Sequence, residues 1–138
     1  MKGRQEIQNF GRKEKALEEQ SLLNSVKESI GINTADEGFD ADLTLTIDGF
    51  LSDLNQVGCG VSTIEDDGKV IVPRIRNLQS LTWNQFFGPV RNPGEDEAIK
   101  YVRLKTKLMF DPPLPATIKW YEDAALEALI RTRNDYDV

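Results

Sequence analysis

Apolar side chains recur at helical spacing in four stretches of the chain, and two of these precede residue 60. The first begins at Ser21 and ends at Gly31-Ile32, a pair typical of a left-handed helix end with an apolar contact behind it. The second runs from residue 41 to 57, with Asp40 placed to cap its first turn. The predicted core-facing residues are Leu22, Leu23, Val26 and Ile30 in the first helix and Leu43, Ile47, Phe50, Leu54 and Val57 in the second.

The strongest helix signal lies between Glu95 and Pro113. Its acidic start, from Glu95 to Glu97, suits the partial positive charge of a helix N-terminus. Asp111 then runs into two prolines, which disfavour helical geometry in the preceding residue and lack an N–H donor. We therefore expect the helix to end near Phe110. The predicted apolar face consists of Ile99, Val102, Leu108 and Met109.

A last helix is predicted to follow the two prolines, because Pro115 is well tolerated in a first helical turn. Its predicted inner face consists of Ile118, Tyr121, Ala125, Leu126, Leu129 and Ile130. The chain then becomes charged and offers no clear closing cap, so we interpret residues 134–138 as a docking tail. The residues predicted to contact a larger partner or a neighbouring subunit are Arg131, Arg133, Tyr136 and Val138.

Between residues 61 and 77 the pattern changes to that of a protruding β-hairpin. Short β-branched runs flank Asp66-Asp67-Gly68, and Asp-Gly is favoured in tight hairpin turns. Pro73 limits the second strand to an edge position or an early end, because proline cannot donate to the strand ladder. Arg74 and Arg76 are predicted to point the same way from an extended chain and to contact another chain.

A short amphipathic helix is predicted around Trp83, because Thr82 and Gln85 have the spacing of a capping box. The aromatic residues of this segment and of the last helix are predicted to belong mainly to the core. They are Trp83, Phe86, Phe87, Trp120 and Tyr121.

These elements predict a mainly α fold, a small bundle of about four to five helices with a protruding β-hairpin or long loop and extended termini. The helical domain spans residues 21–133, with the hairpin inserted at about 61–77. Residues 1–20 precede it as a polar extension without a broad apolar stripe. We interpret this extension as a helix that orders against a neighbour, or alternatively as a mobile arm.

Composition restricts the classes of function. With 138 residues, the chain is long enough for one domain with a substantial core. A net charge of -6 argues against sequence-independent nucleic-acid binding through overall charge, so any contact with DNA would be local. The single cysteine, Cys59, fits a reducing compartment, and no apolar run has the roughly 20 residues of a membrane span.

Candidate chemistry is sparse. The chain has no histidine, which removes the common imidazole bases and most zinc sites. Known phosphate-binding, dinucleotide-binding and nucleophile motifs are missing, and the acidic sets around Asp40 and Asp66 lack the spacing of a calcium loop. No catalytic residue, metal site or cofactor is therefore predicted.

One basic group is a candidate for binding. Lys100, Arg103 and Lys107 have the spacing i, i+3 and i+7, which places them on one side of a helix. This group is predicted to be a solvated face, or a surface that meets an acidic region of a neighbouring subunit, or part of a passage lined for DNA phosphates.

Several short segments carry a resemblance to a known family. They are Leu22-Leu23-Asn24-Ser25-Val26-Lys27, Leu54-Asn55-Gln56-Val57-Gly58, Thr82-Trp83 and Lys107-Leu108-Met109-Phe110-Asp111-Pro112-Pro113. With this order of helices, the chain from Ser21 to about Arg133 resembles the head–tail connector, or adaptor, proteins of tailed bacteriophages. Residues 1–20 lie outside that pattern, and the hairpin is longer than the pattern leads us to expect.

The resemblance implies a structural role without catalysis. Such proteins are mainly helical and assemble as a closed ring, commonly twelve-fold, beneath the portal protein. The ring extends the DNA channel, carries a stopper or tail-completion protein and helps to retain the packaged genome. The implied location is the neck of the virion, and the host cytoplasm before assembly, with DNA passing through without sequence-specific binding and no membrane partner.

Two other classes stay open at this point. A small helical DNA-binding or regulatory module would use the basic group at residues 100–107, although the net charge argues against it. An enzyme based on carboxylates has no recognisable site in the sequence.

Overall fold

The computed structural model describes residues 20–66, 68–88 and 95–136, in which the fold is mainly α with a small antiparallel hairpin. The predicted fold class is confirmed. Residues 1–19 of the predicted extension and Val138 lie outside the described residues. The helices are α2 (Leu22–Ser29), α3 (Asp40–Gln56), α4 (Trp83–Phe87), α5 (Glu95–Phe110) and α6 (Pro115–Tyr136), with a 3₁₀ helix η1 (Arg74–Asn77) and the strands β1 (Thr63–Glu65) and β2 (Ile71–Pro73).

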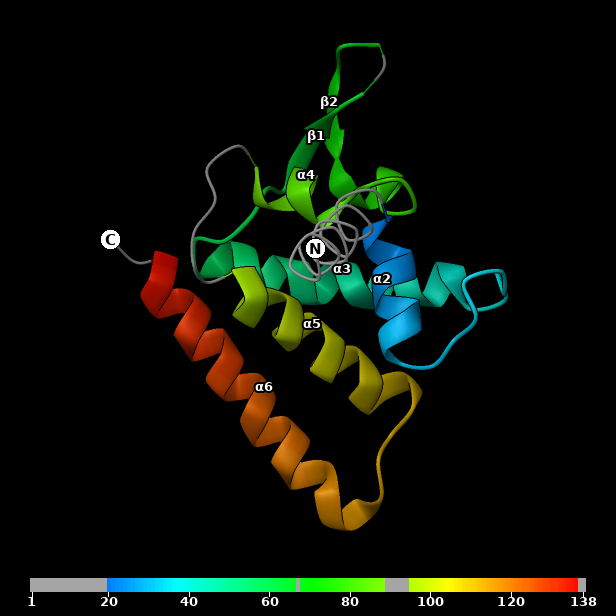
Figure 1. Ribbon diagram of the computed structural model, residues 1–138. Helices are drawn as coiled ribbons and strands as arrows, with labels where there is room; N and C mark the ends of the chain where they lie inside the picture. Colours follow the sequence, from blue (N-terminus) through cyan, green and yellow to red (C-terminus); the bar gives the residue numbers. More distant parts are fainter. Residues whose placement is uncertain (1–19, 67, 89–94, 137–138) are drawn as a thin grey trace, which may run out of the picture.

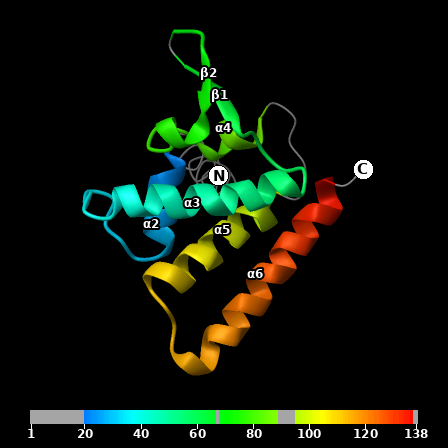
Figure 2. The same ribbon diagram turned by 180° about the vertical axis from the view of Figure 1, so that it is seen from behind.

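The elements give the protein two distinct ends. Helix α3 crosses the middle, α2 and α5 pack against it, and α6 runs back along α5 (Figures 1 and 2). The β-hairpin projects from one end, and the turn between α5 and α6 forms the other. This arrangement separates two protruding tips by the full helical body.

The core joins all five of these α-helices. The predicted inner faces of α2 and α3 are confirmed, with Phe50 and Val57 only partly buried. Leu51 is also fully buried, because the apolar stripe of α3 is wider than one residue per turn. The main buried residues are Leu22, Leu23, Val26, Leu43, Ile47, Leu51, Leu54, Leu78, Leu81, Trp83, Phe86, Tyr101 and Val102.

Helix α2 ends as its sequence predicts. Gly31 has a φ of 83°, and the N–H of Ile32 donates to the carbonyl of Lys27 at 2.9 Å. Ile32 packs against the core. This is the Schellman ending expected from Gly31-Ile32.

The prediction that Asp40 caps α3 is wrong. Phe39 occupies the cap position without a side-chain hydrogen bond, and Asp40 is the first helical residue. Its carboxylate instead pairs at 2.7 Å with Lys27 Nζ, which is fully buried and also donates to the carbonyls of Thr34 and Asp36. A buried ammonium needs an anion and hydrogen-bond acceptors, so Lys27 binds the loop that precedes α3.

The bounds predicted for α5 and for the start of α6 are confirmed, but part of each predicted apolar face is wrong. Met109, Leu126 and Ile130 are exposed. The buried residues of α6 are small instead, namely Ala125, Ala128 and Thr132, and those of α5 are Ala98, Tyr101, Val102 and Thr106. The hydroxyls of Thr106 and Thr132 donate to carbonyls of their own helices at 2.7 and 2.8 Å, which lets these polar residues be buried. Trp120 was predicted to be core and is also exposed.

The hairpin and the capping box form as predicted. Ile64 lies opposite Val72 in the antiparallel register, and β2 ends at Pro73. The N–H of Lys69 donates to the carbonyl of Asp66 and closes the turn. Lys69 itself has a φ of 60°. Thr82 and Gln85 make both hydrogen bonds of the capping box, and the α4 aromatics Trp83, Phe86 and Phe87 are buried.

A glycine at the base of the hairpin gives a stability prediction. Gly60 has a φ of 82°, and a Cβ atom there would lie 2.2 Å from Cζ of Phe86. Gly60→Ala combines left-handed strain with overpacking, so we expect a loss of about 3 kcal/mol in the free energy of unfolding. Gly49→Ala is the control, because Gly49 is exposed in α3 with open space around it, and we expect a gain of about 0.5 to 1 kcal/mol. Urea unfolding of both variants measures this, and equal stabilities would contradict it.

A buried phenol gives a prediction on pH. Tyr101 Oη donates to Asp53 Oδ2 at 2.6 Å, and burial together with this carboxylate raises the pKa of Tyr101 above its ordinary value of 10.0. The unfolded chain then releases the proton at lower pH than the folded chain, so stability contributed by Tyr101 is complete below pH 10.0 and falls as pH rises further.

We expect Tyr101→Phe to lower the free energy of unfolding at pH 7 by about 1 to 2 kcal/mol. The difference between wild type and variant should shrink above the ordinary tyrosine pKa, as measured by urea unfolding across the alkaline range. A difference that grows with pH would contradict the assignment.

Candidate assembly surfaces

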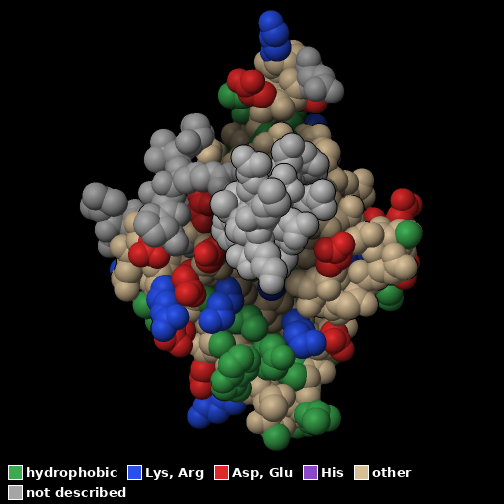
Figure 3. Space-filling view, viewed as in Figure 1, with side chains coloured by type: hydrophobic (Ala, Val, Ile, Leu, Met, Phe, Trp, Pro, Cys, Tyr) green, Lys and Arg blue, Asp and Glu red, His purple; other side chains and the backbone are tan. Residues whose placement is uncertain are grey.

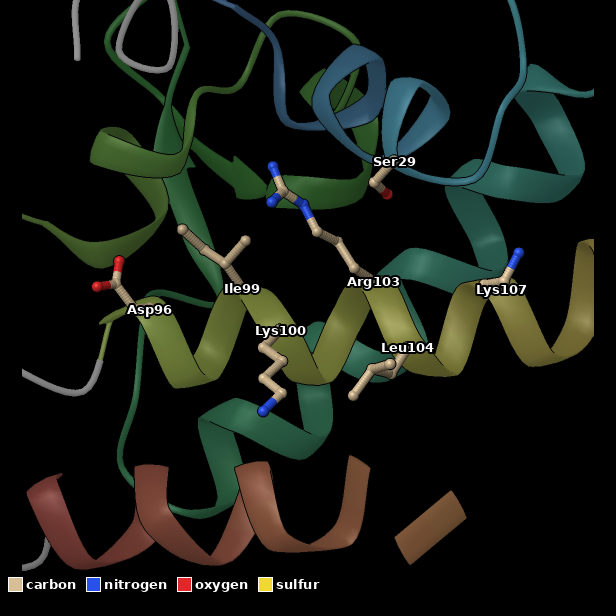
Figure 4. A pocket seen from close by; sticks show the side chains of 7 residues that line it. All are labelled: Ser29, Asp96, Ile99, Lys100, Arg103, Leu104 and Lys107. Atoms are coloured by element: carbon tan, nitrogen blue, oxygen red, sulfur yellow. The ribbon is translucent and has the colours of Figure 1, made fainter. Parts of the chain in front are cut away.

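The predicted basic group on α5 lines a hollow between α5 and α2. The hollow has a volume of about 470 Å³, and Figure 4 shows that its lining comes mainly from α5. The lining residues are Ser29, Asp96, Ile99, Lys100, Arg103, Leu104 and Lys107. The structure therefore places all three basic residues in the lining of one hollow.

The three cations nevertheless differ in their surroundings. Arg103 points toward α2, whereas Lys100 points to the other side of the helix (Figure 4), and the Arg103 guanidinium donates to the buried Ser25 Oγ at 3.0 Å. The same oxygen accepts a hydrogen bond from Trp83 Nε1 at 3.1 Å. Burial lowers the pKa of Arg103, although nearby Glu28 opposes that shift. Arg103 is thus partly a structural link between α5, α2 and α4.

Lys107 also has a partner within its own helix. Its Nζ lies 2.8 Å from Asp111 Oδ2, and this hydrogen bond raises the pKa of Lys107. Within the described part of the chain, Lys107 is the member of the group that makes an ion pair, Arg103 makes a hydrogen bond to Ser25, and Lys100 makes neither. The lining of the hollow therefore includes the apolar Ile99 and Leu104 and the lysine Lys100. A contact of this hollow with a subunit or with DNA stays a prediction.

Among the described residues that line the hollow, Asp96 is the one carboxylate. Among the described residues, no cluster of acids and cysteine could hold a metal ion.

The predicted C-terminal contact residues lie on or beyond the last turns of α6. Arg131 pairs with Glu97 at 3.5 Å and with Glu127, so it ties α6 to the start of α5. Arg133 is exposed and makes no ion pair with another described residue. Helix α6 continues through Tyr136, so residues 134–136 of the predicted tail extend this helix. Their contact with a partner stays a prediction.

The prediction that Arg74 and Arg76 point the same way from an extended chain is wrong. Both lie in the 3₁₀ helix η1, where Arg74 turns inward and is 3% exposed while Arg76 stays exposed. An arginine after a strand can be drawn inward when the neighbouring helix supplies enough acceptors. Arg76 remains a candidate for contact with another chain.

Arg74 joins the base of the hairpin to α3. Its Nε pairs with Asp48 Oδ1 at 2.9 Å, Nη2 donates to Ser52 Oγ at 2.8 Å, and Nη1 donates to Asn55 Oδ1 and to the carbonyl of Val61. The guanidinium carbon also lies 5.8 Å from the centre of the Phe86 ring. Burial lowers the pKa of Arg74, and Asp48 opposes that shift. These contacts fix how the hairpin projects from the helical body.

Exposed large apolar side chains lie at four places of the described chain. They are Phe39 and Leu45 at the start of α3, Val70 and Ile71 on the hairpin, Met109, Leu114 and Trp120 around the α5–α6 turn, and Leu126 and Ile130 on α6. Figure 3 shows apolar side chains between α5 and α6 and at their turn. A second apolar set on the far side of an amphipathic helix is the sequence signal that could have found them, because such patches often mark interfaces.

The described chain is mainly helical and exposes several apolar patches of the kind that mark interfaces. In a comparison with known families, residues 22–138 match the phage connector protein family. The chain therefore belongs to this family and has a structural connector role in bacteriophage. No match was found among curated proteins or among solved structures.

Membership implies oligomerisation and association with other head or tail components. In the described chain no helix is long and apolar enough to cross a membrane.

The two arginines of η1 give a matched test of the hairpin anchor. Arg74→Met leaves Asp48 without its cation and removes the donors to α3, so we expect a loss of about 3 kcal/mol in the free energy of unfolding. Arg76→Met changes an exposed side chain, so its effect should stay within about 0.5 kcal/mol. Urea unfolding compares the two variants, and a stable Arg74→Met protein would show that the anchor is dispensable.

Proposed function

We propose that the chain forms a ring between the phage portal protein and the next component of the neck or tail. The observation that carries this proposal is the family match, which spans the helical domain and the hairpin from residue 22 onward. In this role the ring extends the DNA channel, carries a stopper or tail-completion protein and helps to retain the packaged genome. The protein acts in the virion neck and stays in the host cytoplasm before assembly.

The two ends of the structure support a position between two different partners. The hairpin exposes Val70 and Ile71, and the α5–α6 turn exposes Met109, Leu114 and Trp120. These tips lie at opposite ends of the protein (Figure 1). A connector in a stack needs two such axial contacts, and the flanks between them remain for neighbouring copies.

Charge supports passage of DNA rather than its capture. The net charge of -6 opposes non-specific retention of DNA phosphates. Arg103 and Lys107 are already engaged with Ser25 and Asp111, which weakens the alternative of a DNA-binding module. Packaged DNA then moves through the channel without sequence-specific binding.

The test is assembly with the portal protein of the same phage. We expect the full chain to form rings of defined mass, commonly twelve-fold in such connectors, and to bind the portal, as shown by light scattering and negative-stain imaging. In a second experiment the chain is mixed with duplex DNA in low salt, and we expect it not to bind the DNA. A chain that stays monomeric beside the portal, or that binds DNA in a salt-dependent way, would contradict the proposal.

A further inference from the structure

We propose that residues 1–19 of the chain bind as a helix in the hollow between α5 and α2 of the same chain. The contact lies within one subunit, so this inference goes beyond the proposed ring and does not depend on it. It gives the basic group of α5 a partner, namely the N-terminal extension, in place of a second subunit or DNA phosphates.

The hollow continues the core but is left open by the described chain. Ile99 and Leu104 in its lining are half-buried and pack against the core. Along α5 the lining runs from Asp96 to Lys107 (Figure 4), which corresponds to about 16 Å of helix. A hollow of this length accommodates about three turns of a second helix.

A buried donor beside the hollow has no acceptor. Nη2 of Arg103 donates to Ser25 Oγ at 3.0 Å, but Nε of Arg103 is buried without a hydrogen-bond partner in the described chain. Buried polar groups in proteins nearly always have a partner. The missing partner of Arg103 therefore points to an occupant that brings an acceptor.

The lining of the hollow is positively charged. It holds the three bases of α5 against the single carboxylate of Asp96. Of these bases, Lys107 pairs with Asp111, and Glu28 acts on the Arg103 guanidinium. The remaining base, Lys100, makes no ion pair with a described residue. An acidic side chain is consequently the acceptor that this hollow favours.

The sequence of the extension contains such a side chain within a narrow apolar face. Residues spaced i, i+3, i+7 and i+10 lie on one side of a helix. In residues 1–19 this face consists of Ile7, Phe10, Glu14 and Leu17. Its borders carry Glu6, Glu18 and Lys13, and the other bases of the extension lie outside it. The face is about 15 Å long, which matches the hollow.

The described chain begins close to the hollow. Gln20 precedes Ser21, the N-cap of α2, and one turn further on Ser25 accepts the hydrogen bond from Arg103. Six residues separate Glu14 from Gln20, which is about 9 Å in a helix and about 20 Å in an extended chain. Glu14 can therefore reach Arg103 of its own chain. Attachment at Gln20 also gives this segment a high effective concentration, which favours it over a second copy.

Hydrogen exchange of the full chain at low micromolar concentration tests the contact. We expect residues 7–17 to exchange about tenfold or more slowly than the same residues in a synthetic peptide of residues 1–19. Leu17→Ser should remove most of this protection, because Leu17 belongs to the apolar face. Ala16→Ser is the matched control, since Ala16 falls on the other side of the helix, and it should keep the protection.

Two carboxylates of the extension give a second matched pair. Glu14→Gln removes the proposed acceptor for Arg103, so it should lower the protection of residues 7–17 several-fold. Glu19→Gln makes the same chemical change outside the face and should leave the protection unchanged. Equal protection in the two variants would overturn the role of Glu14.

Cross-linking identifies the occupant. The full chain with Glu14→Cys and Lys100→Cys is treated with a short bis-maleimide, and each single variant is the control; Cys59 is buried in the folded protein and should not react. We expect a cross-linked product with the mass of one chain. A product with the mass of two chains would show that a second copy fills the hollow and would overturn the proposal. Residues 1–19 that exchange as fast as the free peptide would also overturn it, while rings with portal would leave the proposed function intact.

Discussion

The buried guanidinium of Arg74 is the interaction on which the two-ended form of this protein depends. A three-residue strand pair has little stability of its own, since isolated hairpins are marginal in water. Arg74 compensates by joining the hairpin base to three side chains of α3 and to the Phe86 ring. The hairpin can thus project as a defined tip because its base is held by a buried, ion-paired cation.

The helical pair α5 and α6 shows why exposed apolar residues remain for assembly. The fully buried residues of α6 are the small Ala125, Ala128 and Thr132, each of which buries little apolar area. Larger side chains such as Leu126 are left outside. The buried side of α6 therefore stabilises the fold, while large apolar side chains on its other side stay exposed.

Much of the fold could be predicted from local signals. The ends of α2 and α5 depend on Gly31 and on Pro112-Pro113, whose backbone preferences act without help from the rest of the chain. The inner sides of α5 and α6 could not be assigned in the same way, because hydrophobicity alone favours Met109 and Ile130 over Ala98 and Thr132. Arg74 and Lys27 escaped prediction for another reason: burial of a cation depends on acceptors contributed by distant segments. The basic group on α5 was found by its spacing, but the engagement of Arg103 by Ser25 required the packing of α2.

The contrasting places of the two tryptophans have a spectroscopic consequence. Trp83 is 2% exposed and stacks on Phe87, whereas Trp120 is 63% exposed near the α5–α6 turn. The indole emission of the folded protein is therefore the sum of a shielded component and a hydrated component. Acrylamide reaches only the hydrated indole, so quenching that disappears when a partner is added reports coverage of the α5–α6 end. The shielded emission reports in the same cuvette that the core has stayed folded.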